Sequence, residues 1–244
     1  MDHIPLASIF SLITFGMALF CVVFIAIKRR SLMSEGFFTD NFFKAFLLVS
    51  AYLLTTSSPG IFTSNPLTIQ VLYLVGNFFL EITSVYLAYT AFLIFFPRHS
   101  SLIAFIIPLP FIFHAVYLLA FSARFIVPAT MVFVGPFVDW HGAELDSVVY
   151  LAASLFVLVY VLTFIFLFYL KGWNNPNQFV RRRSRLFVIG IGTMISGWLS
   201  IQIFSSAPVS PASFLISSAL GAFLAGFGML VLLRGVLIRE NGNS

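Results

Sequence analysis

Seven long apolar stretches dominate this sequence and decide in which solvent the chain can fold. They occupy approximately residues 4–27, 41–56, 67–96, 101–122, 147–170, 186–205 and 211–238. A helix needs about 20 mostly apolar residues to cross the hydrocarbon layer of a bilayer. We therefore predict an all-α, polytopic membrane protein, with seven transmembrane helices in one domain that covers residues 1–244.

The composition excludes the soluble and disordered classes. Hydrophobic residues make up 60% of the chain and charged residues only 9%. A typical soluble domain is about 25% charged, and disordered chains combine low hydrophobicity with high charge. A chain this apolar needs lipid around it.

The basic residues predict how the seven spans are oriented. If the loops alternate sides, twelve Lys and Arg residues fall on one side of the membrane, and only Arg124 falls on the other. Short cytoplasmic loops are enriched in Lys and Arg. We therefore expect a cell-membrane protein with its N-terminus outside and its C-terminus in the cytoplasm. The twelve residues are Lys28, Arg29, Arg30, Lys44, Arg98, Lys171, Arg181, Arg182, Arg183, Arg185, Arg234 and Arg239.

The densest basic cluster precedes the sixth predicted span. It consists of Arg181, Arg182, Arg183 and Arg185. Such clusters bind anionic lipid headgroups, and the alternative is a docking surface for a cytoplasmic signalling partner. The overall positive charge follows from this topology and implies no nucleic-acid partner.

One carboxyl group lies deep within a predicted span. Glu81 is about 14 residues into the third span, roughly 21 Å along a helix. A charge at that depth is costly, so such residues usually face the interior of a bundle and often have a function. Helical spacing places it in a polar stripe that comprises Gln70, Tyr73, Asn77, Glu81 and Ser84. The stripe predicts either a structural hydrogen-bond network or a ligand- or proton-responsive site.

His114 is the predicted partner of Glu81, because it lies at a similar depth in the fourth span. The short turn at residues 97–100 makes the third and fourth spans neighbours. Pro108 and Pro110 should kink the fourth span and free backbone carbonyls that His114 could bind.

Two further segments leave alternatives open. Residues 125–137 are apolar but broken by Pro128, Gly135 and Pro136, which favours a reentrant or surface-lying piece over a span. In the last span, a row of small residues permits close helix packing, either within the protein or in a homo-oligomer. This row is Ser217, Gly221 and Ala225.

The sequence contains no motif of a known enzyme class. A Gly-x-Ser-x-Gly motif, a His-Glu-x-x-His motif and a phosphate-binding Gly-rich loop are all missing. The last span has no lysine for a retinal Schiff base, and the single cysteine, Cys21, cannot form an internal disulfide. We expect no catalytic activity, no cofactor and no bound metal.

The order of parts resembles the seven-helix N-terminal sensor region of some bacterial histidine kinases and diguanylate cyclases. The first span ends in Lys28-Arg-Arg, and the third turns through Phe96-Pro-Arg. An Arg-rich entry at 181–185 leads into the sixth span, and the last span exits through 233–239. Those receptors continue into a catalytic domain and this sequence does not, so the resemblance implies a stand-alone sensor or accessory subunit.

The predicted function is a receptor-like or accessory membrane module that relays a signal to a separate partner. The first alternative is a small transporter or channel subunit that uses the polar stripe around Glu81. The second is a membrane enzyme with a site at Glu81 and His114.

Overall fold

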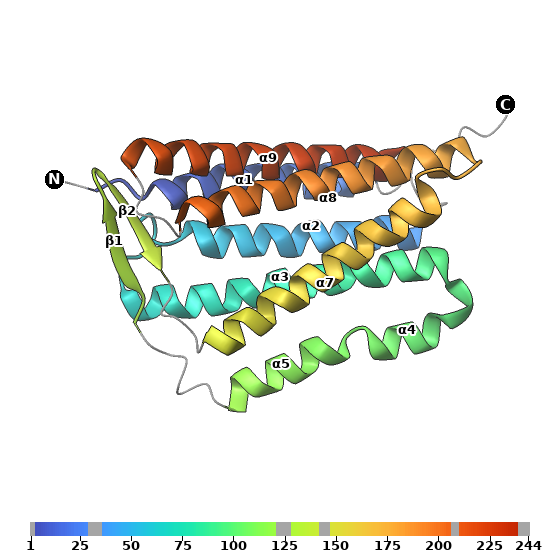
Figure 1. Ribbon diagram of the computed structural model, residues 1–244, viewed down its shortest axis with the longest axis horizontal. Coiled ribbons are helices and arrows are strands. Elements are labelled where there is room, and N and C mark those ends of the chain that lie inside the picture. Colours follow the sequence, from blue (N-terminus) through green and yellow to red (C-terminus); the bar gives the residue numbers. More distant parts are fainter. Residues whose placement is uncertain (1–2, 29–35, 121–127, 142–146, 206–209, 239–244) are drawn as a thin grey trace.

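A helical bundle with a small β-hairpin at one end makes up the protein (Figure 1). The computed structural model describes residues 3–28, 36–120, 128–141, 147–205 and 210–238. The helices are α1 (Leu6–Lys28), α2 (Gly36–Ser57), α3 (Pro66–Phe95), α4 (Ser100–Ile106), α5 (Leu109–Ala120), α7 (Ser147–Gly172), α8 (Gln178–Ser205) and α9 (Pro211–Leu237). A short 3-10 turn, η2 (Pro97–His99), joins α3 to α4.

Successive long segments of the bundle run in alternating directions (Figure 1). The N-terminal ends of α1, α3, α7 and α9 therefore lie at the same end as the hairpin. The described basic residues gather at the opposite end, which we call the basic end. They include Lys28 in the last turn of α1, Arg98 in η2, Lys171 in the last turn of α7 and Arg234 in the last turn of α9.

Four helices are long and apolar enough to cross a membrane, which indicates a membrane-embedded protein. They are Leu6–Lys28, Pro66–Phe95, Ser154–Gly172 and Pro211–Leu237. In the described residues, the other three predicted spans are not both long enough and apolar enough to be counted with these four. Asp40 and Lys44 lower the hydropathy of α2, the Arg cluster occupies the first turns of α8, and the fourth span is divided.

The outward faces of the bundle suit a lipid environment. Large apolar side chains are exposed on α1, α5, α7 and α9, and Phe113 is 72% exposed. Soluble monomers rarely expose contiguous apolar surface on this scale. Prominent examples are Phe20, Phe105, Phe113, Phe166, Ile216 and Phe223.

The fourth predicted span is divided at Pro108, as the sequence suggested. Helix α4 ends at Ile106 and α5 begins at Leu109. A proline lacks the N–H that would continue the helical hydrogen bonds. The hydroxyl of Tyr160 on α7 donates to the carbonyl oxygen of Ile107 at this break. His114, which was expected to bind a carbonyl freed at this break, instead contacts Glu81.

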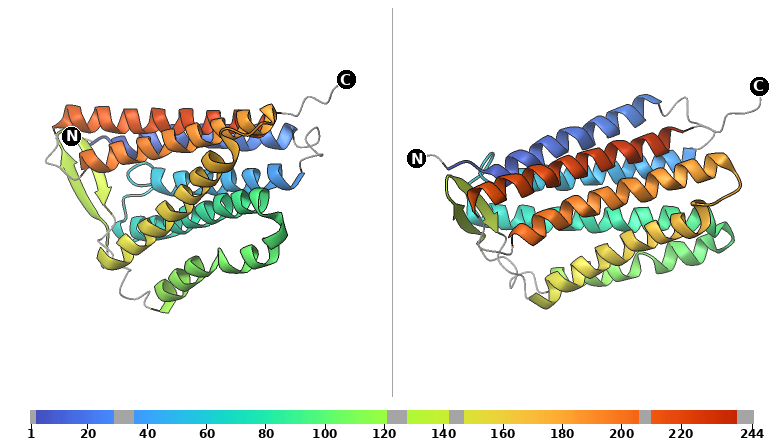
Figure 2. Two further views of the ribbon diagram at one scale, coloured as in Figure 1. Left: turned by 45° about the vertical axis from the view of Figure 1, so that its right-hand side comes forward. Right: turned by 45° about the horizontal axis from the view of Figure 1, so that its top comes forward.

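Residues 130–141 form an antiparallel hairpin, so the mostly helical protein is not purely α-helical as predicted. The hairpin takes up part of the segment 125–137 that was predicted to be reentrant or surface-lying, and residues 125–127 lie outside the described residues. Strand β1 (Thr130–Val134) pairs with β2 (Phe137–His141) in the register Thr130↔His141. Gly135 begins the two-residue turn with a φ of +62°, which glycine adopts without strain. In both views of Figure 2 the hairpin lies at the end of the bundle where α1 and α3 begin.

Backbone hydrogen bonds hold the hairpin to the bundle. Val138 N–H donates to the carbonyl of Ile4, and Ile4 N–H donates to the carbonyl of Pro136, at 3.0 and 3.1 Å. The amide of Ala129 donates to the carbonyl of Pro66 at 3.1 Å. The hairpin therefore covers the starts of α1 and α3.

The hydrophobic core is richest in phenylalanine where α2, α7 and α8 meet. Phe42, Phe164 and Phe187 are almost fully buried. The rings of Phe42 and Phe187 stack with centroids 4.9 Å apart, and Phe168 meets Phe187 edge-on at 5.0 Å. This cluster fixes α2, α7 and α8 around one wall of the cavity described below.

Candidate functional site

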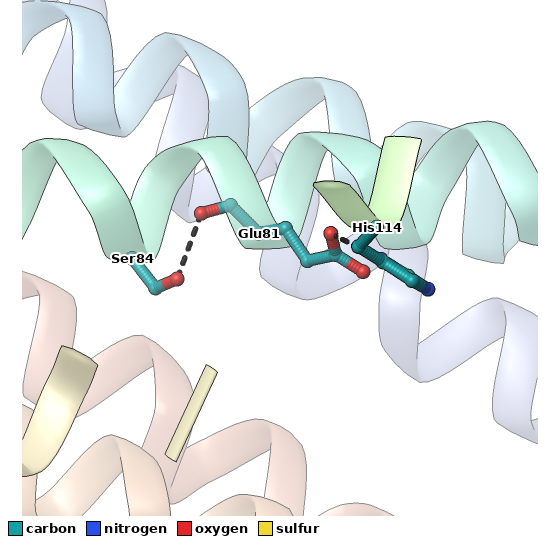
Figure 3. Close-up of polar contacts among 3 residues, drawn as sticks. All are labelled: Glu81, Ser84 and His114. Atoms are coloured by element: carbon teal, nitrogen blue, oxygen red, sulfur yellow. Dashed lines mark hydrogen bonds and ion pairs between the residues drawn. The ribbon is translucent and has the colours of Figure 1, made fainter. Parts of the chain in front are cut away.

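Glu81 and His114 form a buried pair between α3 and α5 (Figure 3). Atom Nδ1 of His114 lies 2.9 Å from Oε2 of Glu81. Glu81 is 4% exposed and His114 is 8% exposed. The structure thus turns Glu81 inward and brings it to the partner that the depth of the two residues predicted.

Aromatic rings support this pair on the side of His114. The ring of Phe78 lies one turn before Glu81, with its centroid 6.3 Å from that of His114. Phe78 also meets Phe111 of α5 edge-on at 6.1 Å. The pair and these rings are the main described contacts between α3 and α5, so Glu81 and His114 help to attach α5 to the bundle.

The predicted polar stripe divides into two parts. Tyr73 belongs to the hairpin end, where its hydroxyl donates to the carbonyl of Trp140 at 2.6 Å. Gln70 is buried near the same end of α3. Asn77, Glu81 and Ser84 instead line an internal cavity together with His114.

This cavity has a volume of about 420 Å³ and lies among α1, α2, α3, α5, α7, α8 and α9. Most of its lining is apolar, with aliphatic side chains such as Val157, Leu158 and Leu232. Its ionisable carboxyl and imidazole come from Glu81 and His114, and no Asp, Lys or Arg is among its lining residues in the described part of the chain. Small-molecule sites in proteins typically combine such an apolar wall with a few polar groups.

Several hydroxyl groups on the cavity wall already donate their hydrogens to their own helix. A helical Ser or Thr often bonds the carbonyl of the preceding turn in this way. These bonds run from Thr14 to Phe10, from Thr83 to Phe79 and from Ser84 to Glu81, at 2.8, 2.7 and 2.7 Å. They leave these hydroxyl oxygens as acceptors.

The second ring nitrogen of His114 is in a different situation. Nε2 is buried and has no hydrogen-bond partner among the residues that the structure describes. In Figure 3 it lies at the end of the ring that points away from Glu81. A buried polar atom without a partner costs about 1–3 kcal/mol, so this atom marks a place where a ligand would gain a hydrogen bond.

The arginine cluster at the basic end is partly structural. Arg183 donates from Nε to the carbonyl of Gly235 at 3.2 Å and from Nη2 to that of Ile238 at 2.7 Å. A cation there binds the free carbonyls and the negative dipole end of α9. Arg185 donates to the carbonyl of Trp173 at 3.3 Å. Arg182 is exposed and Arg181 half-exposed, so these two face the surroundings.

The row of small residues in α9 packs inside the protein. Ser217 and Gly221 are buried, and Ala225 is half-buried. A Cβ atom at Gly197 of α8 would lie 2.8 Å from the carbonyl oxygen of Gly221 and 3.1 Å from the amide of Ala225. The row therefore allows close approach of α8, and the chain's own helices cover it.

Within the described residues, no group of three His, Cys, Asp or Glu side chains could hold a metal ion. Cys21 is buried in α1 and has no disulfide partner. The cavity itself had no signal in the sequence, because its lining is drawn from many helices and follows from their packing. Only the polar residues of its wall were visible as a pattern.

Comparisons with known proteins add no relative to these observations. No protein-family model matches the chain, and a search of curated proteins found no match. No functional residue can therefore be transferred from another protein.

Proposed function

We propose that this protein is a receptor-like membrane module that binds a small apolar ligand in its internal cavity. The observation that carries the proposal is the cavity of about 420 Å³ with the buried Glu81–His114 pair in its wall. A largely apolar volume with a few polar groups in its wall is the usual chemistry of a ligand pocket. The proposal includes no catalytic step.

We also propose that the chain crosses the membrane seven times. Segments α2, α4–α5 and α8 lie alongside the four apolar helices and alternate with them in direction (Figure 1). If all of them cross the membrane, the described basic residues lie on one side. The rule that basic loops stay inside then places the basic end in the cytoplasm and the hairpin outside.

A route for the signal also belongs to this proposal. Helix α5 carries His114, and α4 and η2 continue from it to Arg98 at the basic end. A ligand that changes the contact between His114 and Glu81 would shift this segment against α3. We propose that a separate cytoplasmic partner reads this shift.

Cysteine labelling tests the orientation. With Cys21 replaced by serine, a cysteine at Val132 in the hairpin should react with a membrane-impermeant maleimide added to intact cells. A cysteine at Asn175, between α7 and α8, should react only after the cells are permeabilised. Both positions are accessible in the structure, since Val132 is exposed and Asn175 is half-exposed. The opposite pattern would reverse the proposed orientation.

Photolabelling tests ligand binding. The protein in lipid nanodiscs is irradiated with a long-chain alkyl diazirine, and labelled residues are identified by mass spectrometry. We expect saturable labelling of cavity-lining residues on α3 and α9, such as Leu74 and Met229. Labelling of lipid-facing side chains such as Phe223 should rise without saturation.

A matched pair of variants separates the cavity from the lipid surface. Ala222→Phe places a large ring at the cavity wall and should abolish the saturable labelling. Ile216→Phe adds the same ring to the same helix on its exposed face and should leave it unchanged. Labelling that never saturates, or that is equal in the two variants, contradicts the proposed function.

A further inference from the structure

The Glu81–His114 pair presents a defined hydrogen-bonding group to the cavity. The pair is surrounded by apolar side chains, and among the described cavity-lining residues no other carboxylate and no Lys or Arg is present to balance a charge. An uncompensated charge in such surroundings is very costly, whereas a pair without net charge is tolerated. A pair without net charge is therefore the arrangement that these surroundings favour.

A neutral pair holds one proton between the two groups. If the proton is on Glu81, the carboxyl O–H donates to Nδ1, and the neutral imidazole carries its hydrogen on Nε2. If the proton is on Nδ1, the imidazolium carries hydrogens on both nitrogens. In both of these arrangements Nε2 bears a hydrogen, and the buried atom without a partner is a donor. A proton on Oε1 would instead let Nδ1–H donate to Oε2 and leave Nε2 as an acceptor, and the competition described below would then show no preference for a ligand that accepts a hydrogen bond.

We infer that the ligand is an uncharged apolar molecule with a carbonyl-type acceptor, which accepts a hydrogen bond from Nε2 of His114. The inference rests on the proposed ligand-binding function and names the chemical class of the ligand. The hydroxyls of Thr14, Thr83 and Ser84 already donate to backbone carbonyls, so they offer no donor to this acceptor. A carboxylate ligand would add a net charge to the neutral pair and is disfavoured for the same reason.

The test is a competition between two ligands of one shape. Methyl nonyl ketone and the hydrocarbon in which a CH2 group replaces its carbonyl oxygen compete against the alkyl diazirine for the cavity. On the unaltered protein in nanodiscs, the ketone should compete about fivefold better at equal membrane concentration, as expected for one hydrogen bond. His114→Phe should reduce this preference to about onefold, since it removes the donor.

Asn77 supplies the control, because its amide also lines the cavity and could donate. Asn77→Leu should leave the preference for the ketone unchanged. Loss of the preference in Asn77→Leu, with His114→Phe unaffected, would overturn the inference. His114→Phe leaves Glu81 without its partner and could therefore disturb the cavity as well as remove the donor. Infrared spectroscopy of the unaltered protein tests the hydrogen bond without any substitution.

The carbonyl stretch of the bound ketone should lie at lower frequency than that of the same ketone in lipid, because the bond to Nε2 weakens it. An unshifted stretch overturns the inference. Equal competition by the ketone and the hydrocarbon also overturns it, yet leaves ligand binding intact. If neither compound competes and the probe never saturates, the proposed function itself fails.

Discussion

Replacing Glu81 with leucine should destabilise the protein by about 1–3 kcal/mol, the cost of leaving a buried polar partner unbonded. His114 is 8% exposed, and Glu81 is its hydrogen-bond partner, so the imidazole would keep no bond in its place. Thermal unfolding in nanodiscs or detergent, followed by circular dichroism, measures the change. The substitution should also weaken the attachment of α5 to α3. Faster proteolytic cleavage between α5 and the hairpin would detect this change.

Glu81→Gln is the matched variant for this prediction. The amide retains an oxygen acceptor and an N–H donor for His114, so the loss of stability should be small. A Glu81→Leu variant as stable as the unaltered protein would show that the pair does not hold α5. If Glu81→Gln abolished ligand binding without any change in stability, the ionisation of Glu81 would itself be required.

Gly190→Ala should destabilise the contact between α8 and α9 by about 1–3 kcal/mol, the usual cost of forcing extra volume into a packed interior. A Cβ atom at Gly190 would lie 2.9 Å from the carbonyl oxygen of Gly228 and 2.8 Å from Cγ of Leu232. The first of these neighbours is backbone, which cannot move aside without separating the helices. Thermal unfolding again measures the effect.

Gly192 provides the control for this prediction, two residues along the same helix. A Cβ atom there would meet nothing within 4 Å. Gly192→Ala should therefore raise stability by about 0.5–1 kcal/mol, the gain of alanine over glycine inside a helix. Equal effects of the two substitutions would contradict the close approach of α8 to α9.

The sequence was most informative where placing a single residue in an apolar helix costs free energy. The inward position of Glu81 follows from the desolvation of its carboxyl, and Pro108 dictates the break between α4 and α5. The hairpin was missed because helical hydropathy was the criterion. Its signal was present in the β-branched and aromatic residues of 130–134 and 137–141 on either side of the Gly135-Pro136 turn.

Features that depend on how the helices pack could not be predicted from hydropathy and residue spacing in a single sequence. The role of Arg183 at the end of α9 joins residues that are far apart in sequence, with Gly235 and Ile238 as its acceptors. The cavity is likewise a gap in the packing of many helices. The sequence identified Asn77, Glu81, Ser84 and His114 as polar residues, and only the fold shows that they face one apolar volume.

The cavity beside His114 should hold a ligand in the working protein. The most direct measurement is a crystal structure of the protein with a methyl ketone whose alkyl tail ends in bromine. We expect anomalous density for bromine inside the cavity and the carbonyl oxygen about 2.7–3.2 Å from Nε2 of His114. Bromine density confined to the lipid-facing surface, with the cavity free of ligand, would contradict it.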